Sequence, residues 1–119
     1  MAAGAGAIFV TLAIFSGRRD PEWSISSSHL KYAEIKQLLD NARTAGFTYD
    51  PIRMPPRLGY KGFVVKASNI NKRELIVGPN TVKLQQLLLE TAPGDVLPQG
   101  LKDEVLAEIN SGNVRPGDP

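Results

Sequence analysis

The chain has 119 residues, of which 42% are hydrophobic and 22% charged, and this suits one globular domain with a single core. It has no cysteine, which excludes disulfides, thiolate chemistry and zinc sites with cysteine ligands. The net charge of +2 is too small to indicate a polyanionic partner.

The charge is unevenly distributed along the chain. Residues 1–84 carry 12 basic and 6 acidic side chains, whereas residues 85–119 carry 2 basic and 6 acidic ones. A chain polarised in this way can attract copies of itself head to tail, or dock a charged partner at one end. Ordinary scatter of charges is the alternative interpretation.

Residues 7–15 form an apolar run rich in β-branched and aromatic side chains, which predicts a strand over residues 8–16. The run is too short to cross a bilayer as a helix, and no Lys or Arg precedes it as in a signal peptide. Its apolar side chains fall on both faces of the strand, with Ile8, Val10, Leu12 and Ile14 on one and Phe9, Ala13 and Phe15 on the other. Both faces therefore need cover, from helices or from another subunit.

Helical periodicity predicts three helices, over residues 29–45, 81–91 and 101–110. Gly46 and Gly112 are the expected stops of the first and the last. Two further strands, over residues 61–67 and 74–77, are expected to pair as an antiparallel hairpin. The strand over residues 8–16, followed by a helical crossover, is expected to lie parallel to a neighbour.

The sequence therefore predicts an α+β fold of order β-α-β-β-α-α, with a three-stranded mixed sheet packed with helices. The expected organisation is a flexible leader over residues 1–7, a single domain over residues 8–112 and a polar tail over residues 113–119.

Two short motifs occur in a fixed order: FSGRRDPEW at residues 15–23 and LGYKGFV at residues 58–64, followed by a leucine-rich helix that ends near residues 87–92. Over residues 8–92 the chain resembles a set of small uncharacterised proteins with FSGRxxPxW and LGYxGF elements. Arg19 departs from the small or proline-like residue of that set. The resemblance implies no activity and no site residue.

Arginine and aromatic side chains supply a candidate binding surface. Arg18 and Arg19 suit a carboxylate or a phosphate, although they could instead pair with Asp20, Glu22 or the acidic C-terminal third of the chain. An anionic ligand, a glycan or a nucleic acid would be held by Arg18, Arg19, Trp23, Arg53, Arg57 and Tyr60. The low net charge argues against nucleic acid as the partner.

No catalytic constellation is recognisable in the sequence. His29 is the only histidine, and neither a metal-ligand spacing nor a nucleophile turn nor a phosphate-loop pattern accompanies it. We therefore expect no enzymatic activity, no cofactor and no metal site.

The leading hypothesis is a structural or protein-interaction module that assembles with itself into an oligomer or a filament. The apolar strand would complete a neighbour's sheet through Ile8, Phe9, Val10, Leu12 and Ile14. The alternative is the small binding domain with the arginine and aromatic surface. We expect the cytoplasm if the chain starts at its true N-terminus, and an extracellular location if it is a filament subunit.

Overall fold

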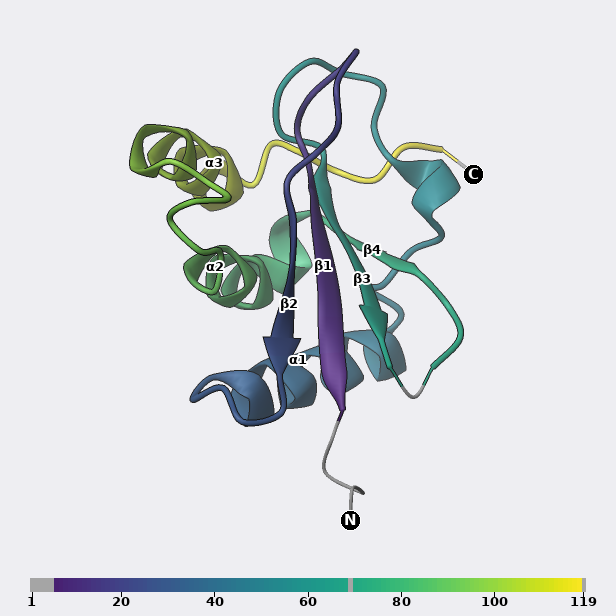
Figure 1. Ribbon diagram of the computed structural model, residues 1–119. Coiled ribbons are helices and arrows are strands. Elements are labelled where there is room, and N and C mark those ends of the chain that lie inside the picture. Colours follow the sequence, from purple (N-terminus) through teal and green to yellow (C-terminus); the bar gives the residue numbers. More distant parts are fainter. Residues whose placement is uncertain (1–5, 69, 119) are drawn as a thin grey trace.

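The computed structural model describes residues 6–68 and 70–118 as one α+β unit. Its sheet is built from β1 (Ala7–Ala13), β2 (Glu22–Ser26), β3 (Gly62–Ala67) and β4 (Glu74–Ile76). The spatial order is β2-β1-β3-β4, and every neighbouring pair is antiparallel (Figure 1).

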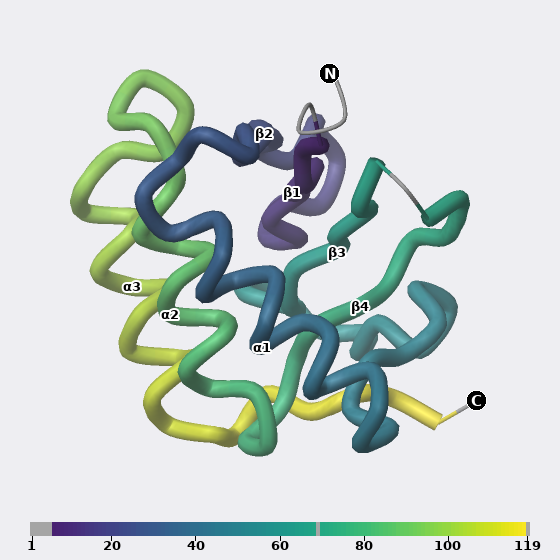
Figure 2. The backbone as a smooth tube through the Cα atoms, turned by 90° about the horizontal axis from the view of Figure 1, so that it is seen from below, coloured from purple at the N-terminus to yellow at the C-terminus, as the bar shows by residue number. Residues whose placement is uncertain are grey.

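The helices lie to one side of this sheet (Figure 2). They are α1 (Tyr32–Ala45), α2 (Val82–Glu90) and α3 (Gln99–Ser111), with short 3-10 turns η2 (Pro51–Arg53) and η3 (Pro79–Thr81). The outermost of the three, α3, packs against α2. The opposite face of the sheet carries no helix among the described residues.

The α+β class is confirmed, whereas the three-stranded mixed sheet was wrong, because the sheet has four strands and is antiparallel throughout. The missing strand is β2. Its core residues Trp23 and Ile25 alternate with exposed Glu22, Ser24 and Ser26, a strand period of two. Since β2 returns along β1 directly after a short loop, the two strands run antiparallel and no helical crossover intervenes.

The first helix begins at Tyr32, because residues 27–31 form turns, and the serines before it provide no side-chain cap. Its end is as predicted: Gly46 adopts a left-handed conformation with φ of 83°. Gly112, with φ of 69°, ends α3 in the same way.

The core lies between the sheet and the helices. From the sheet come Ile8, Val10, Leu12, Ile25, Phe63, Val65 and Ile76, and from the helices Ile35, Leu39, Leu84, Leu87, Leu88, Val105 and Ile109. The chain's own helices therefore cover the face of β1 that includes Ile8, which is the cover expected for an apolar strand face.

Both ends of the described chain contact the domain. Ser27 N donates to Gly6 O at 3.0 Å, and Gly117 N donates to Arg53 O at 2.6 Å. Val114, in the segment predicted as a polar tail, is buried. Most of the predicted leader, residues 1–5, lies outside the described residues. None of the described helices has the length and apolar character needed to cross a membrane.

Candidate functional site

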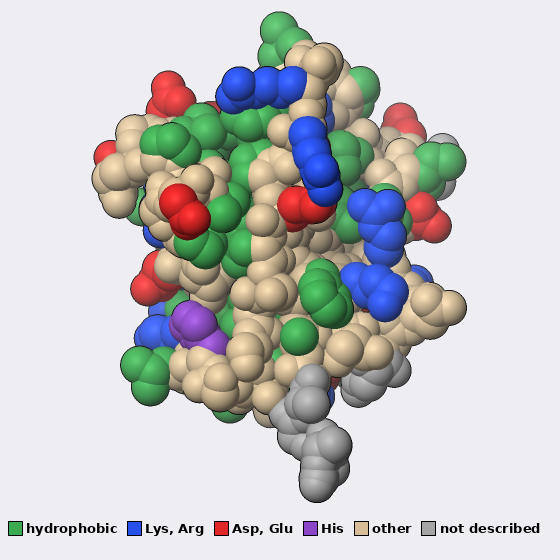
Figure 3. Space-filling model, in the orientation of Figure 1, with side chains coloured by type: hydrophobic (Ala, Val, Ile, Leu, Met, Phe, Trp, Pro, Cys, Tyr) green, Lys and Arg blue, Asp and Glu red, His purple; other side chains and the backbone are tan. Residues whose placement is uncertain are grey.

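The side of the sheet away from the helices is only partly uncovered, because Ala13, Val64 and Leu75 on this side are buried. The uncovered part, which we call the open face, consists of side chains that alternate with the core residues. It comprises Phe9 and Thr11 of β1, Glu22, Ser24 and Ser26 of β2 and Lys66 of β3. In Figure 3 this face is turned to the viewer, and it consists mostly of backbone and of side chains that are neither hydrophobic nor charged.

Phe9 occupies the middle of the open face. Its register partners are Ser24 on β2 and Lys66 on β3, so polar side chains flank it on both sides. The Phe9 side chain is 49% exposed, although β1 is a central strand. A shallow groove of about 350 Å³ runs beside it, bordered by Thr11 and Glu22. A large aromatic ring thus remains in water on a surface that is otherwise polar.

The outer edge of β2 borders the open face and is unpaired. Leu12 N donates to Pro21 O at 2.9 Å, and because such pairs alternate along the ladder, the backbone groups of Glu22 and Ser24 point away from β1. No strand among the described residues pairs with them. The β4 edge differs, since Tyr49 bridges it through two hydrogen bonds to Leu75.

A second cluster lies where β1 ends and β3 begins. Ala13 pairs with Gly62, and Lys61 N donates to Ala13 O at 2.8 Å, so the loops over residues 14–21 and 55–61 leave the same end of the sheet. These loops carry four basic side chains, which we call the cationic apex: Arg18, Arg19, Arg57 and Lys61. Basic side chains gather at this end of the molecule in Figure 3.

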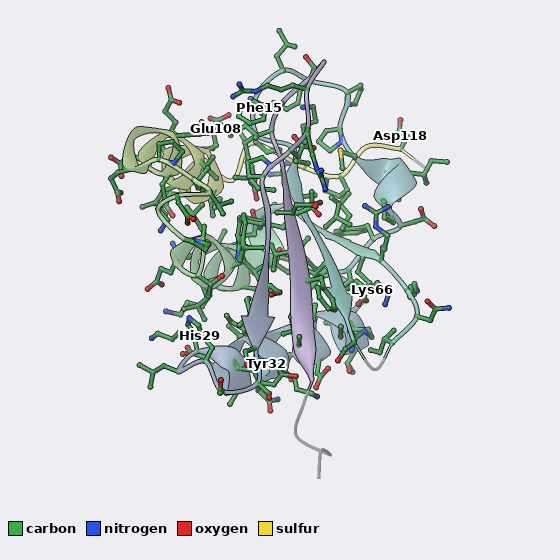
Figure 4. All side chains as sticks on the ribbon, viewed as in Figure 1. Phe15, His29, Tyr32, Lys66, Glu108 and Asp118 are labelled. Carbon is green, nitrogen blue, oxygen red and sulfur yellow. The ribbon has the colours of Figure 1, made fainter. Side chains whose placement is uncertain are left out.

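The first apical loop, over residues 14–21, is stabilised by hydrogen bonds to the carboxylate of its own Asp20. Asp20 Oδ1 accepts hydrogen bonds from Ile14 N at 3.1 Å and Phe15 N at 2.8 Å, which ends β1 earlier than the apolar run predicts. The Arg18 guanidinium lies 3.7 Å from the centre of the Phe15 ring, a cation–π contact. Phe15 lies at the opposite end of the sheet from Tyr32 (Figure 4).

The candidate binding set from the sequence is therefore only partly brought together. Arg18, Arg19 and Arg57 share the apex. Arg53 lies in η2, where its Nε donates to Gly117 O at 3.0 Å and its guanidinium packs over the Tyr49 ring.

The two aromatic members of that set belong to the core. Trp23 is 8% exposed, and its indole N–H donates to Thr91 Oγ1 at 2.9 Å. Tyr60 is 2% exposed, and its hydroxyl donates to Gln85 Oε1 at 2.6 Å. Neither ring is presented to solvent as a stacking surface for a base or a sugar.

The residues of the predicted assembly strand are also divided. Ile8, Val10, Leu12 and Ile14 are buried in the domain's own core, and only Phe9 is exposed. Both edges of β1 are paired, with β2 and with β3. Sequence analysis missed the roles of Lys66 and Ser24, although the alternation of polar with apolar residues over 22–26 marks Ser24 as exposed.

His29 is exposed and takes part in a local turn, in which its Nδ1 accepts from Lys31 N at 3.0 Å. Within the described part of the chain, no group of three or more His, Cys, Asp or Glu side chains is arranged to hold a metal ion.

No protein-family model, no curated protein and no solved structure matches the chain. The resemblance to proteins with FSGRxxPxW and LGYxGF elements stays a prediction. The functional interpretation therefore depends on the open face and the cationic apex.

Proposed function

We propose that the protein is an interaction module that associates with a second copy of itself through the open face, with Phe9 at the centre of the contact. The observation that carries this proposal is the 49% exposure of Phe9 in the middle of a strand that is paired on both sides. Aromatic side chains contribute a large share of the energy of protein interfaces, and a central position excludes water best.

The arrangement of charges favours a second copy as the occupant. Glu22 lies on the β2 side of Phe9 and Lys66 on the β3 side. A two-fold axis parallel to β1 would place β2 of one copy over β3 of the other. Phe9 would then face Phe9 of the second copy, and Ser24 would lie over Lys66. Glu22 lies two residues farther along its strand, where the long Lys66 side chain of the second copy can approach its opposite charge. Two sheets stacked in this way form an aligned sandwich with the helices outside.

This proposal uses the domain as folded and requires no exchange of strands. The hydroxyl groups of Ser24, Ser26 and Thr11 would surround the central ring as a polar rim. Such a contact is small and wet, so we expect a reversible association that depends on protein concentration.

The test is molecular mass by light scattering over a series of protein concentrations. The wild type should rise above 12.9 kDa as the concentration increases, and Phe9→Ser should remain at that mass. The matched control is Leu30→Ser, which removes a leucine that is 96% exposed and lies outside the open face. This control should associate as the wild type does.

A charge exchange tests the register of the contact. Glu22→Lys should weaken association by placing like charges together, and adding Lys66→Glu should restore it. A wild type that stays at 12.9 kDa throughout, or equal loss in the Phe9 and Leu30 variants, would sink the proposal.

A further inference from the structure

We infer that the cationic apex docks on the surface of an anionic lipid bilayer. Its four cations come from two loops that are distant in sequence and are brought together by the pairing of Ala13 with Gly62. The inference does not depend on self-association, because the apex lies at one end of the sheet and the open face lies on its side.

The charge of the apex is incompletely neutralised. Arg18 and Lys61 form no ion pair with any carboxylate of residues 6–68 and 70–118. Arg19 is paired with Glu22 and Arg57 with Glu108, each at 2.7 Å. These four side chains are 84%, 52%, 38% and 39% exposed, and pairs so exposed are weak and can open for a stronger partner. The nearby Asp20 carboxylate is engaged by backbone N–H groups.

An apolar side chain projects among these cations. Leu58 is 80% exposed and lies directly between Arg57 and Gly59 in the chain. Gly59, with φ of 82°, forms the turn that follows, and a side chain as exposed as that of Leu58 lies mostly in solvent. A projecting leucine flanked by basic residues suits the headgroup region, where the apolar group enters the acyl boundary and the cations meet lipid phosphates.

A small anion held in a cavity fits the apex less well. The cavity next to these loops has a volume of about 200 Å³ and is bordered by Ile14, Gly59 and Tyr60. Its other lining residues include the carboxylates of Glu104 and Glu108, which repel anions. None of the four apical cations lines this cavity, and Arg18, Arg19 and Arg57 are exposed, so a flat anionic membrane can contact them.

The experiment is sedimentation with vesicles of phosphatidylcholine, with and without phosphatidylserine. The protein should bind only the vesicles that contain phosphatidylserine, and added salt should weaken binding. The double variant Arg18→Gln and Arg19→Gln should lose roughly 25-fold in affinity, since each cation near an anionic surface contributes about fivefold. Leu58→Ser should lose about tenfold with its salt dependence unchanged.

The matched control is the double variant Lys72→Gln and Arg73→Gln. It removes the same charge from two adjacent exposed cations in the β3–β4 connection, at the opposite end of the sheet. Retained binding by this control supports docking through the apex. A loss equal to that of the Arg18 and Arg19 variant indicates unspecific attraction and overturns the assignment of the apex as the membrane contact.

Unchanged vesicle binding by Leu58→Ser, together with competition by a soluble oligonucleotide, would instead identify a soluble polyanion as the ligand and would also overturn the assignment. Phe9→Ser should bind the same vesicles through the same residues.

Discussion

Arg43 of α1 and Glu74 of β4 form a bidentate ion pair at the margin of the core. Arg43 Nη2 donates to Glu74 Oε1 at 2.7 Å, and Nε donates to Oε2 at 3.0 Å. Glu74 is only 1% exposed, whereas the Arg43 side chain is 32% exposed. Arg43 therefore provides the hydrogen bonds and the opposite charge that the buried Glu74 carboxylate needs, and the pair connects α1 to β4.

Replacing Arg43 with methionine should destabilise the protein strongly. The buried Glu74 carboxylate would lose its partner, and we expect a loss of about 2–3 kcal/mol in the free energy of unfolding at neutral pH, measured by urea denaturation. Lys36→Met is the control, because Lys36 pairs only with Asp40 on the exposed surface and should cost less than about 1 kcal/mol. Equal effects of the two variants would contradict a special role for the Glu74 pair.

The same pair predicts how stability depends on pH. Burial raises the pKa of Glu74, but hydrogen bonds from Arg43 and Thr48, with the charges of Arg43 and Lys72, outweigh this and hold the pKa below its ordinary value of 4.5. The Glu74 carboxylate therefore binds a proton more readily in the unfolded state than in the folded state. Its contribution to the free energy of unfolding is complete above pH 4.5 and is lost as the pH falls through the pKa of the folded state. In Arg43→Met the charge and hydrogen bonds that oppose the effect of burial on the Glu74 pKa are lost. The loss in free energy of unfolding relative to wild type should therefore shrink as the pH is lowered and Glu74 becomes protonated. A deficit that stays constant with pH would contradict this account.

Tyr60 and Gln85 form a second buried contact, which links the apical loop over residues 55–61 to α2. Gln85 in turn donates from Nε2 to Gly78 O at 2.8 Å and to Thr81 Oγ1 at 3.0 Å. Tyr60→Phe should cost about 1–2 kcal/mol by leaving Gln85 Oε1 without its donor. Tyr49→Phe, at a half-buried ring, is the control and should cost less in the same denaturation experiment.

Alkaline titration offers an independent measurement of Tyr60. Burial raises its pKa well above the ordinary value of 10.0, so the folded state keeps the proton where the unfolded state releases it. Stability from this group is therefore fully present below pH 10 and declines above it. Tyr60→Phe should flatten that alkaline decline, and an unchanged decline would show that other groups cause it.

The sequence was sufficient for the helices and for the hairpin of β3 and β4, because both signals are local. Gly46 and Gly112 mark the helix ends through a conformation that other residues rarely adopt. It was insufficient for β2, whose five residues include three hydroxyl or acidic side chains on the open face. The parallel arrangement expected for β1 followed from that omission.

The candidate sites illustrate a further limit. Arg18 and Arg19 are neighbours in the chain, but Arg57 joins them only through the register of β1 with β3. Likewise, apolar residues on both faces of β1 indicate that each face needs an apolar partner, but they do not show whether that partner is a helix of the same chain or another subunit. The structure covers Val10 with helices and leaves Phe9 exposed, a distinction that depends on how many helices the chain can place on the sheet.

Gly62 of the LGYKGF segment should not tolerate a side chain. Its φ is 121°, and an added Cβ would lie 2.9 Å from Val77 Cβ and 3.0 Å from Ile76 O. We expect Gly62→Ala to lose at least about 2 kcal/mol of stability or to accumulate unfolded. Gly100→Ala is the control, since it lies in α3 with open space around it and should stabilise by up to about 1 kcal/mol in thermal denaturation. A neutral Gly62→Ala would contradict the tight contact with β4.

The unpaired edge of β2 provides the sharpest check on how two copies meet. Ser24→Pro removes a backbone N–H that points away from β1, so the fold should retain its ladder and lose little stability. If the copies stack through their open faces, this variant should still associate while Phe9→Ser does not. If they instead pair edge to edge, Ser24→Pro should abolish association and Phe9→Ser should spare it. Light scattering on the two variants, with circular dichroism to verify folding, separates these arrangements.

Disulfide crosslinking of Ser24→Cys adds a direct measurement, because the chain has no cysteine of its own. Antiparallel pairing of β2 with β2 of a second copy, centred on residue 24, brings the two Cα atoms to about 5.5 Å, within reach of a disulfide. Face-to-face stacking predicts no crosslinking above that of Lys83→Cys, a control at an exposed position of α2.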